Sequence, residues 1–143
     1  VVAIRASTTQ VHVSWRMLGT DTDAVAFNLY RTLAGGQPTK VNASPLTLTT
    51  DYRDTLNSNA IDLGVSYHVR PVIDGVEQAA STAFVLPAFA PVQPFLSVPL
   101  QVPPGGVTPS GEAYTYTAND AAPADLDGDG EYELVLKWEP TNA

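Results

Sequence analysis

Apolar and polar residues alternate in three short stretches of the chain, residues 11–15, 25–29 and 65–69. A period of two puts the apolar side chains of each stretch on one face, which is typical of β-strands with one buried face. We find no convincing helical period in any segment. Asp74-Gly75 predicts a two-residue hairpin turn that leads to a return strand near residues 77–86. The pattern therefore predicts an all-β chain that begins with a β-sandwich over residues 1–86.

Two aromatic residues refine this sandwich to a fibronectin type III-like one. Trp15 lies in an early strand, where such domains place a core tryptophan. Ile61, Gly64 and Tyr67 have the spacing of a tyrosine corner, in which the Tyr hydroxyl donates a hydrogen bond to the backbone. Ordinary buried Trp and Tyr residues are the alternative interpretation of both signals.

The composition changes after residue 86. Most of the 12 prolines lie between residues 87 and 109, where Pro103-Pro104 is followed by Gly105-Gly106. Proline removes backbone donors and stiffens the chain, so residues 87–111 are predicted to be an extended connector. Apolar residues still alternate with other residues from 96 to 102, which favours a connector that lies along a surface.

Residues 112–143 form the third predicted region. Residues 114–117 and 132–138 have strand patterns, and an acidic loop separates them. A lone two-stranded unit is marginally stable in water. We therefore interpret this region as the opening of a β-propeller blade, whose neighbouring strands would follow Ala143.

The acidic loop is the most specific candidate for a functional site in the sequence. Residues 125–133 contain five acidic residues at alternate positions, with Gly128 and Gly130 between them. Carboxylates this close repel one another unless a cation lies among them, and Ca²⁺ takes six to eight oxygen ligands in flexible geometry. The predicted ligands are the side chains, or for Glu131 the backbone carbonyl, of Asp125, Asp127, Asp129, Glu131 and Glu133.

The spacing of these acids separates the loop from an EF-hand. An EF-hand needs a bidentate Glu at the twelfth loop position, which is Leu136 here. An acid at the ninth position that enters a strand fits the calcium loops of integrin-like and related propeller blades. Mg²⁺ fits less well because it demands a tight octahedron. A solvated acidic turn without metal is the remaining alternative.

Charge and composition exclude several classes of partner and chemistry. The net charge is −8 over 143 residues, so nucleic acid and anionic membrane surfaces are poor partners. There is no Cys, which excludes disulfides, thiolate metal sites and cysteine catalysis. There is also no apolar run of the length that spans a membrane. Val1 looks like the start of a mature or trimmed chain.

Several motifs occur together in a familiar order. They are Val-Val-Ala-Ile-Arg at 1–5, Val-Ser-Trp-Arg at 13–16, Phe-Asn-Leu-Tyr-Arg at 27–31, Tyr-His-Val-Arg-Pro-Val at 67–72, Ala-Asn-Asp-Ala at 118–121 and Asp-Leu-Asp-Gly-Asp-Gly-Glu-Tyr-Glu-Leu-Val-Leu-Lys-Trp at 125–138. In this respect the chain resembles the N-terminal part of the rhamnogalacturonan lyases of polysaccharide lyase family 11. The resemblance covers essentially the whole chain and is most specific from residue 114 to residue 142.

The resemblance implies a fold, an activity and a location. It implies a small sandwich before a calcium-stabilised β-propeller, in a secreted bacterial enzyme that cleaves the rhamnogalacturonan I backbone of pectin by β-elimination. The implied partners are this pectic polysaccharide and the remainder of the propeller. Asn119 and Glu139 match positions near the family's substrate cleft, although the family pattern has Asp at the second position. A turn-capping Asn and a solvent-facing Glu are the alternatives.

The catalytic residues stay unassigned from the sequence. His12 and His68 lie on predicted sandwich strands, where surface positions are the more common role. The catalytic groups are expected beyond residue 143, so the 143-residue chain alone is predicted to be inactive. A non-catalytic adhesion protein with an integrin-like calcium propeller is the competing hypothesis. A sandwich that itself binds carbohydrate ranks third.

Overall fold

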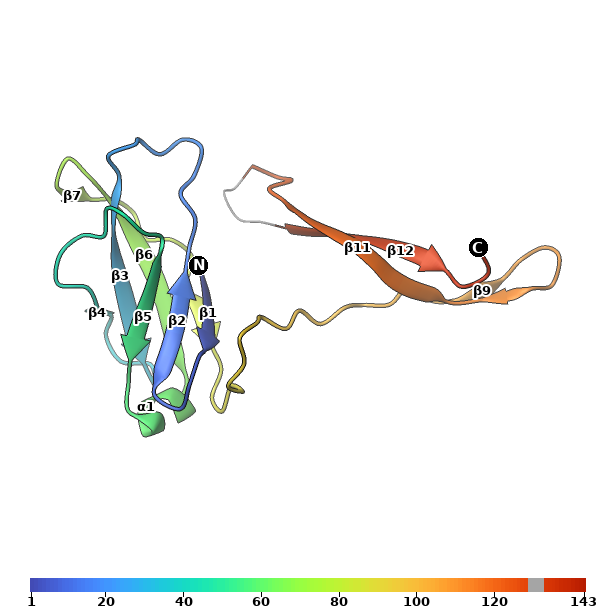
Figure 1. The fold of residues 1–143 in the computed structure, drawn as a ribbon, viewed down its shortest axis with the longest axis horizontal. Helices are drawn as coiled ribbons and strands as arrows, with labels where there is room; N and C mark the ends of the chain where they lie inside the picture. The colour runs from blue at the N-terminus through green and yellow to red at the C-terminus, as the bar shows by residue number, and fades with distance from the viewer. Residues whose placement is uncertain (129–132) are drawn as a thin grey trace. The chain divides into compact units, whose positions relative to one another are not determined.

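The computed structural model describes residues 1–128 and 133–143. Within them the chain forms two compact units, Val1–Ser97 and Val98–Ala143. Almost all regular structure is β, as the alternating pattern predicts, and one short helix accompanies it in the described residues. Figure 1 shows the strands of both units.

The first unit contains two antiparallel sheets. One sheet has the strand order β1-β2-β5 and the other has the order β4-β3-β6-β7, with β8 also paired to β6. The first sheet consists of β1 (Val2–Arg5), β2 (Gln10–Ser14) and β5 (Asp51–Thr55). The second consists of β3 (Ala26–Leu33), β4 (Thr39–Lys40), β6 (Val65–Ile73), β7 (Val76–Glu77) and β8 (Phe84–Leu86).

The core of this unit is built from the inward faces of both sheets. Val11 and Val13 of β2 are fully buried, as are Leu29 of β3 and Tyr67 of β6. In β2 and in the first half of β6 every second residue is buried, which confirms the period-two prediction for both strands. Trp15 is a core residue, as predicted, because it directly follows β2 and continues the buried alternation of Val11 and Val13.

The predicted hairpin turn is confirmed. Asp74 and Gly75 both have positive φ angles, 49° and 79°, and they connect β6 to β7. This left-handed backbone matches the twist of the flanking strands, and Asn, Asp and Gly tolerate it best. The predicted return strand is interrupted between β7 and β8. The interruption stays alongside β6, because the backbone N–H of Ser81 donates to the Val69 carbonyl over 2.9 Å.

The tyrosine corner prediction is wrong in its hydrogen bond. The Tyr67 hydroxyl donates to Asp54 Oδ2 over 2.8 Å, not to the backbone. Arg31 Nη1 contacts both carboxylate oxygens of the same Asp54 at 2.9 Å. Asp54 belongs to one sheet, whereas Arg31 and Tyr67 belong to the other. A buried carboxylate needs partners, so it attracts the hydroxyl across the core.

The short helix α1 (Ser58–Asp62) was missed by the sequence analysis. Its five residues are too few to display a period of 3.6, so it had no pattern to reveal it. Its visible signal is the N-cap Asn57, whose side chain accepts a hydrogen bond from the Ala60 N–H over 2.8 Å. Asp62 pairs with Arg5 of β1 at 2.7 Å, which fixes the helix to the sheet end.

The first part of the proline-rich stretch belongs to the first unit. Ala90 is buried in the core, Val92 forms a bridge to Arg5, and the Gln93 N–H donates to the Arg5 carbonyl over 3.1 Å. Residues 87–97 therefore extend the sandwich beyond residue 86. The alternating apolar residues farther along, Leu96 to Val102, are between 45% and 61% exposed.

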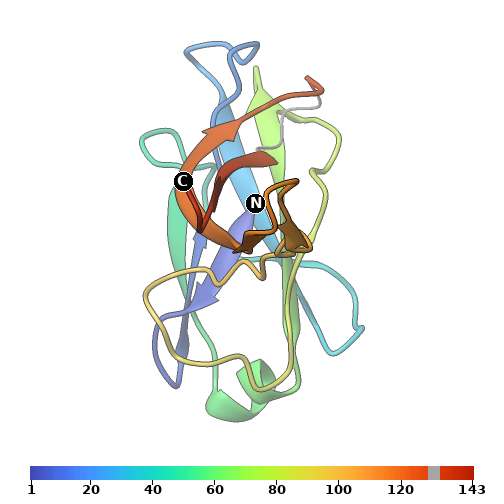
Figure 2. The same cartoon turned by 90° about the vertical axis from the view of Figure 1, so that its right-hand side faces the viewer.

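The second unit consists of two antiparallel pairs. They are β9 (Gly106–Val107) with β10 (Ala113–Tyr114), and β11 (Tyr116–Ala124) with β12 (Glu133–Pro140). Gly106 permits the close approach of β10, since a Cβ there would lie 2.6 Å from the Tyr114 hydroxyl oxygen. The predicted strand at residues 114–117 is divided at Thr115 between β10 and β11, and β11 runs on to residue 124. Figure 2 shows both pairs from a second direction.

Candidate metal centre and polar cluster

Both sites predicted from the sequence lie on the hairpin of β11 and β12. The acidic loop connects the two strands, and Asn119 and Glu139 lie one on each strand. The strands pair antiparallel from Tyr116↔Pro140 to Ala124↔Glu133. The acidic loop therefore lies at one end of the hairpin, and Glu139 lies near the opposite end.

Three of the predicted metal ligands converge. Carboxylate oxygens of Asp125, Asp127 and Glu133 all lie within 4.8 Å of one another. Two oxygens that each lie about 2.3–2.6 Å from one Ca²⁺ can be at most about 5 Å apart. The three side chains therefore fit a single Ca²⁺. Asp129 and Glu131, the other two predicted ligands, lie outside the described residues.

Backbone hydrogen bonds hold this arrangement. The Gly128 N–H donates to Asp125 Oδ1 over 2.9 Å, and the Leu126 N–H donates to Glu133 Oε2 over 2.8 Å. Gly128 has a φ of 78°, a left-handed backbone that curls the loop and that glycine adopts without strain. These two bonds orient the carboxylates of Asp125 and Glu133. Hard oxygen donors without nitrogen or sulfur suit Ca²⁺ rather than a softer metal.

A β-bulge positions the second predicted site. Ala118 faces Trp138 and Ala121 faces Leu136, so the two residues Asn119 and Asp120 lie opposite the single residue Lys137. A bulge bends its strand and changes the direction of the side chains on it. No sequence pattern indicates this extra residue, because a bulge arises from pairing with a partner strand.

The bulge brings Asn119 next to Glu139. Asn119 Nδ2 donates a hydrogen bond to Glu139 Oε2, and Lys137 Nζ lies 3.3 Å from Glu139 Oε1. The hydrogen bond from Asn119 lowers the pKa of Glu139 below its ordinary 4.5, and Lys137 lowers it further. Glu139 is therefore ionised at neutral pH. We call Asn119, Lys137 and Glu139 the polar cluster.

Lys137 was not assigned to this site from the sequence. Its signal was its spacing, because residues two apart on a strand point to the same face. The positions Lys137 and Glu139 satisfy that rule on β12. The polar cluster thus combines an amide, an ammonium group and a carboxylate on one exposed face, a set of donors and acceptors that can bind sugar hydroxyls.

The two histidines lie on strands of the first unit, as predicted. His12 Nδ1 is 4.0 Å from Asp51 Oδ2. The His68 ring stacks on Tyr30 with centroids 5.2 Å apart. Burial and, after it, the nearby Arg70 lower the pKa of His68. Both imidazole rings therefore interact with neighbouring side chains of the first unit.

The comparisons with known proteins agree across the chain. Residues 1–86 match the model of the rhamnogalacturonan I lyase beta-sheet domain, and residues 95–143 match that of the C-terminal domain of rhamnogalacturonan lyase family 11.

No helix in the described residues has the length and apolar character needed to cross a membrane.

Individual relatives give the same result. The chain is 51% identical over 133 residues to the rhamnogalacturonan endolyase YesW of Bacillus subtilis (strain 168), which is 93% of this chain and 19% of that protein. It is 43% identical over 133 residues to the exolyase YesX of the same organism, again 93% of this chain and 20% of that protein. A crystal structure of YesW superposes with a TM-score of 0.67 at 46% identity, over 99% of this chain and 22% of that one. The chain spans about a fifth of the length of these relatives, and it belongs to the rhamnogalacturonan lyases of polysaccharide lyase family 11.

Proposed function

We propose that this chain is part of a secreted lyase that cleaves the rhamnogalacturonan I backbone of pectin by β-elimination. The observation that carries the proposal is the 51% identity to a rhamnogalacturonan endolyase over 133 residues. The polar cluster and the acidic loop both lie within residues 95–143, which match the model of the C-terminal domain of rhamnogalacturonan lyase family 11. The adhesion hypothesis has no counterpart among the relatives above, which are lyases.

We further propose that the first unit is a fibronectin type III-like sandwich and that the second opens a β-propeller blade. The supporting observation for the first is the strand order, with β1-β2-β5 in one sheet and β4-β3-β6-β7 in the other. For the second, the support is an exposed hairpin whose strand β12 has Leu134 and Val135 on its surface. Such strands pair and pack with neighbours in a propeller.

The acidic loop is proposed to bind one Ca²⁺. Asp125, Asp127, Asp129 and Glu133 would supply carboxylate oxygens, and Glu131 would supply a backbone carbonyl. When bound, the ion neutralises the crowded carboxylates and ties the loop to the start of β12. The support is the 4.8 Å convergence of three carboxylates, two of which, Asp125 and Glu133, are oriented by backbone hydrogen bonds. The proposed role of the ion is structural.

The polar cluster is proposed to bind sugar hydroxyls of the polysaccharide. Cleavage by β-elimination needs a base for the C5 proton, an acid at the leaving oxygen and a positive group at the uronate carboxylate. Glu139 does not suit the acid, because its lowered pKa keeps it ionised. Its carboxylate instead accepts hydrogen bonds, and Asn119 and Lys137 hold it in place. We assign no catalytic residue within the 143 residues.

Activity of the full-length protein on rhamnogalacturonan tests the assignment, with the ultraviolet absorbance of the unsaturated uronate as the readout. We expect cleavage by the full-length protein and none by the 143-residue chain. In the full-length protein, Glu139→Gln should raise KM more than it lowers kcat, because it removes a binding contact. Glu112→Gln is the matched control, since Glu112 is an exposed acid of the same unit. Unsaturated product formed by the 143-residue chain would contradict the proposal that its catalytic groups are absent.

A further inference from the structure

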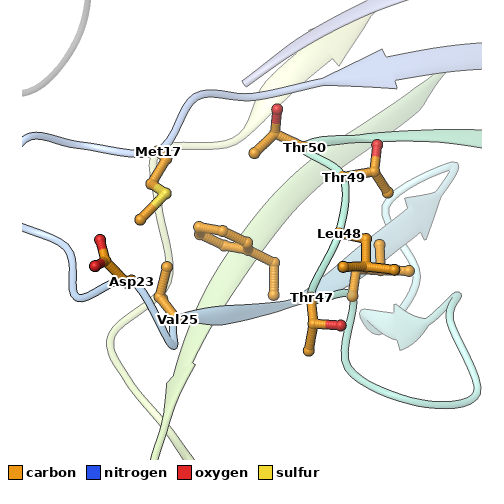
Figure 3. A pocket seen from close by; sticks show the side chains of 9 residues that line it. Met17, Asp23, Val25, Thr47, Leu48, Thr49 and Thr50 are labelled. Carbon is orange, nitrogen blue, oxygen red and sulfur yellow. The ribbon is translucent and has the colours of Figure 1, made fainter.

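An open pocket lies at one end of the first unit. It forms where the loop between β2 and β3, residues 15–25, meets the segment of residues 46–50 that precedes β5. Figure 3 shows the side chains of both segments around this space. Its volume is about 390 Å³, which falls in the range of about 300–1,000 Å³ that is typical of ligand pockets.

Backbone contacts hold the two segments together. Phe27 and Leu46 exchange both backbone hydrogen bonds at 2.9 Å, and the Trp15 N–H donates to the Thr50 carbonyl over 2.9 Å. Phe27 is itself fixed by the core, because its ring packs edge-on to Trp15 with centroids 5.7 Å apart. The floor and one wall of the pocket are therefore preformed, which lowers the entropic cost of binding a ligand.

The lining divides into an apolar part and a hydroxyl-bearing part. Five of the nine lining residues are apolar, namely Met17, Val25, Phe27, Leu46 and Leu48. Phe27 and Val25 are buried, whereas Met17 is 42% exposed and Leu48 is 99% exposed. The apolar residues thus form both the floor and part of the rim, and Thr47, Thr49 and Thr50 line the rest. The Thr49 hydroxyl already pairs with Asp51, so Thr47 and Thr50 supply the hydroxyl groups for a ligand.

The charge of the pocket selects against anions. Asp23 is the one charged residue among the nine that line it. Asp21 lies in the same loop, where its carboxylate accepts a hydrogen bond from the Leu18 N–H over 2.7 Å. An anionic ligand would meet the Asp23 carboxylate, and no cation is among the nine lining residues. The lining suits a neutral ligand that has hydroxyl groups and one apolar end.

We propose that this pocket binds the neutral 6-deoxyhexose unit, rhamnose, of the polysaccharide. The inference rests on the proposed function, because that function supplies the polymer of rhamnose and galacturonate. The C6 methyl group of rhamnose matches the apolar floor, and its ring hydroxyls match Asp23 and the hydroxyl groups of Thr47 and Thr50. The carboxylate of galacturonate is repelled by Asp23. The first unit would then hold the polysaccharide as a binding module.

A nuclear magnetic resonance titration of the 143-residue chain tests the proposal. The probes are methyl α-L-rhamnoside, methyl α-L-mannoside, which differs by one added hydroxyl at C6, and D-galacturonate. We expect the rhamnoside to shift amide signals of residues 17–27 and 46–50, with a Kd on the order of 1 mM. The mannoside should bind about fivefold or more weakly because its added hydroxyl enters an apolar site. Galacturonate should cause no shifts in these segments.

Exposed residues provide the variants, since their replacement leaves the core intact. Leu48→Ala and Met17→Ala should each weaken rhamnoside binding about threefold or more. Leu63→Ala is the control, because Leu63 is 68% exposed and follows α1 at the other end of the strands. Equal shifts with galacturonate, shifts confined to other residues, or unchanged affinity in both pocket variants would overturn the proposal.

The outcome separates this inference from the proposed function. Rhamnoside binding in the pocket without rhamnogalacturonan cleavage by the full-length protein would refute the lyase assignment and retain the pocket. Cleavage without rhamnoside shifts would refute the pocket alone. Loss of the shifts in Leu48→Ala with unchanged cleavage of a short oligosaccharide would support a binding site separate from the chemistry.

Discussion

The two units of this chain bury their apolar residues very differently. Among the described residues, every apolar side chain that is buried lies in Val1–Ser97, where two sheets enclose one core. In the second unit Leu134 and Val135 of β12 are 53% and 47% exposed. A pair of strands has no second layer to cover its faces. The first unit is thus organised around a core of its own, whereas the described residues of the second unit enclose no such core.

The largest expected effect concerns the buried contact between the two sheets. Asp54→Ala removes a carboxylate whose side chain is 4% exposed, and it leaves Arg31 and Tyr67 without their partner. We expect the free energy of unfolding of the first unit to fall by about 3–5 kcal/mol. Urea denaturation followed by near-ultraviolet circular dichroism measures it.

The control for this variant lies on the same strand. Asp51→Ala changes a side chain that is 52% exposed, and it should alter the free energy of unfolding by less than about 0.5 kcal/mol. Equal stability of the Asp54 and Asp51 variants would show that the core alone holds the two sheets together.

Tyr67→Phe is expected to destabilise the first unit less than Asp54→Ala does. The change removes one hydrogen bond to a carboxylate and keeps the Arg31 contact, so we expect the free energy of unfolding to fall by about 1.5–3 kcal/mol. Burial raises the pKa of the Tyr67 phenol well above its usual range, and the Asp54 carboxylate adds to the rise. The folded state therefore keeps this phenol protonated, and its contribution is lost as the pH rises above the ordinary Tyr value. If the Tyr67→Phe protein were as stable as the parent, the hydrogen bond from Tyr67 to Asp54 would contribute nothing to stability.

Calcium titration tests the second unit. If the ion compensates for missing packing, Glu133→Ala should weaken calcium binding about tenfold or more, which corresponds to about 1.4 kcal/mol. Isothermal calorimetry on the 143-residue chain gives the affinity, and Glu112→Ala serves as the control. Extracellular modules often bind Ca²⁺ with a Kd of about 10⁻⁴–10⁻³ M. Identical affinities of the two variants would exclude Glu133 as a ligand.

The smallest effect is electrostatic and concerns the polar cluster. Glu139 has a lowered pKa in the folded chain, so its interactions with Asn119 and Lys137 are fully present above the ordinary value of 4.5. They are lost as the pH falls through the lowered value. Asn119→Ala should move the Glu139 pKa upward, because it removes the larger of the two causes. Carboxyl signals in a nuclear magnetic resonance pH titration report this shift. Thr117→Ala, on the same strand, should leave the Glu139 pKa nearly unchanged.

Local patterns were informative where a residue's role depends on its neighbours in the chain. Strands β2 and β6, the Asp74-Gly75 turn and the buried Trp15 all followed from spacing or backbone preference. The helix α1 did not, because five residues cannot show a period. The bulge at Asn119 was also beyond the sequence, since the register of β11 is defined only by its pairing with β12.

The sequence by itself determined the all-β class, the family and the concentration of carboxylates in one loop, because strand period, motif order and residue spacing are properties of the chain. The tertiary structure decided which of these groups meet. It replaced the backbone acceptor of Tyr67 with Asp54, placed Asn119 and Lys137 around Glu139, and opened a pocket beside Phe27. Each of these contacts joins separate strands or loops, so it depends on how the strands pair and how the sheets pack.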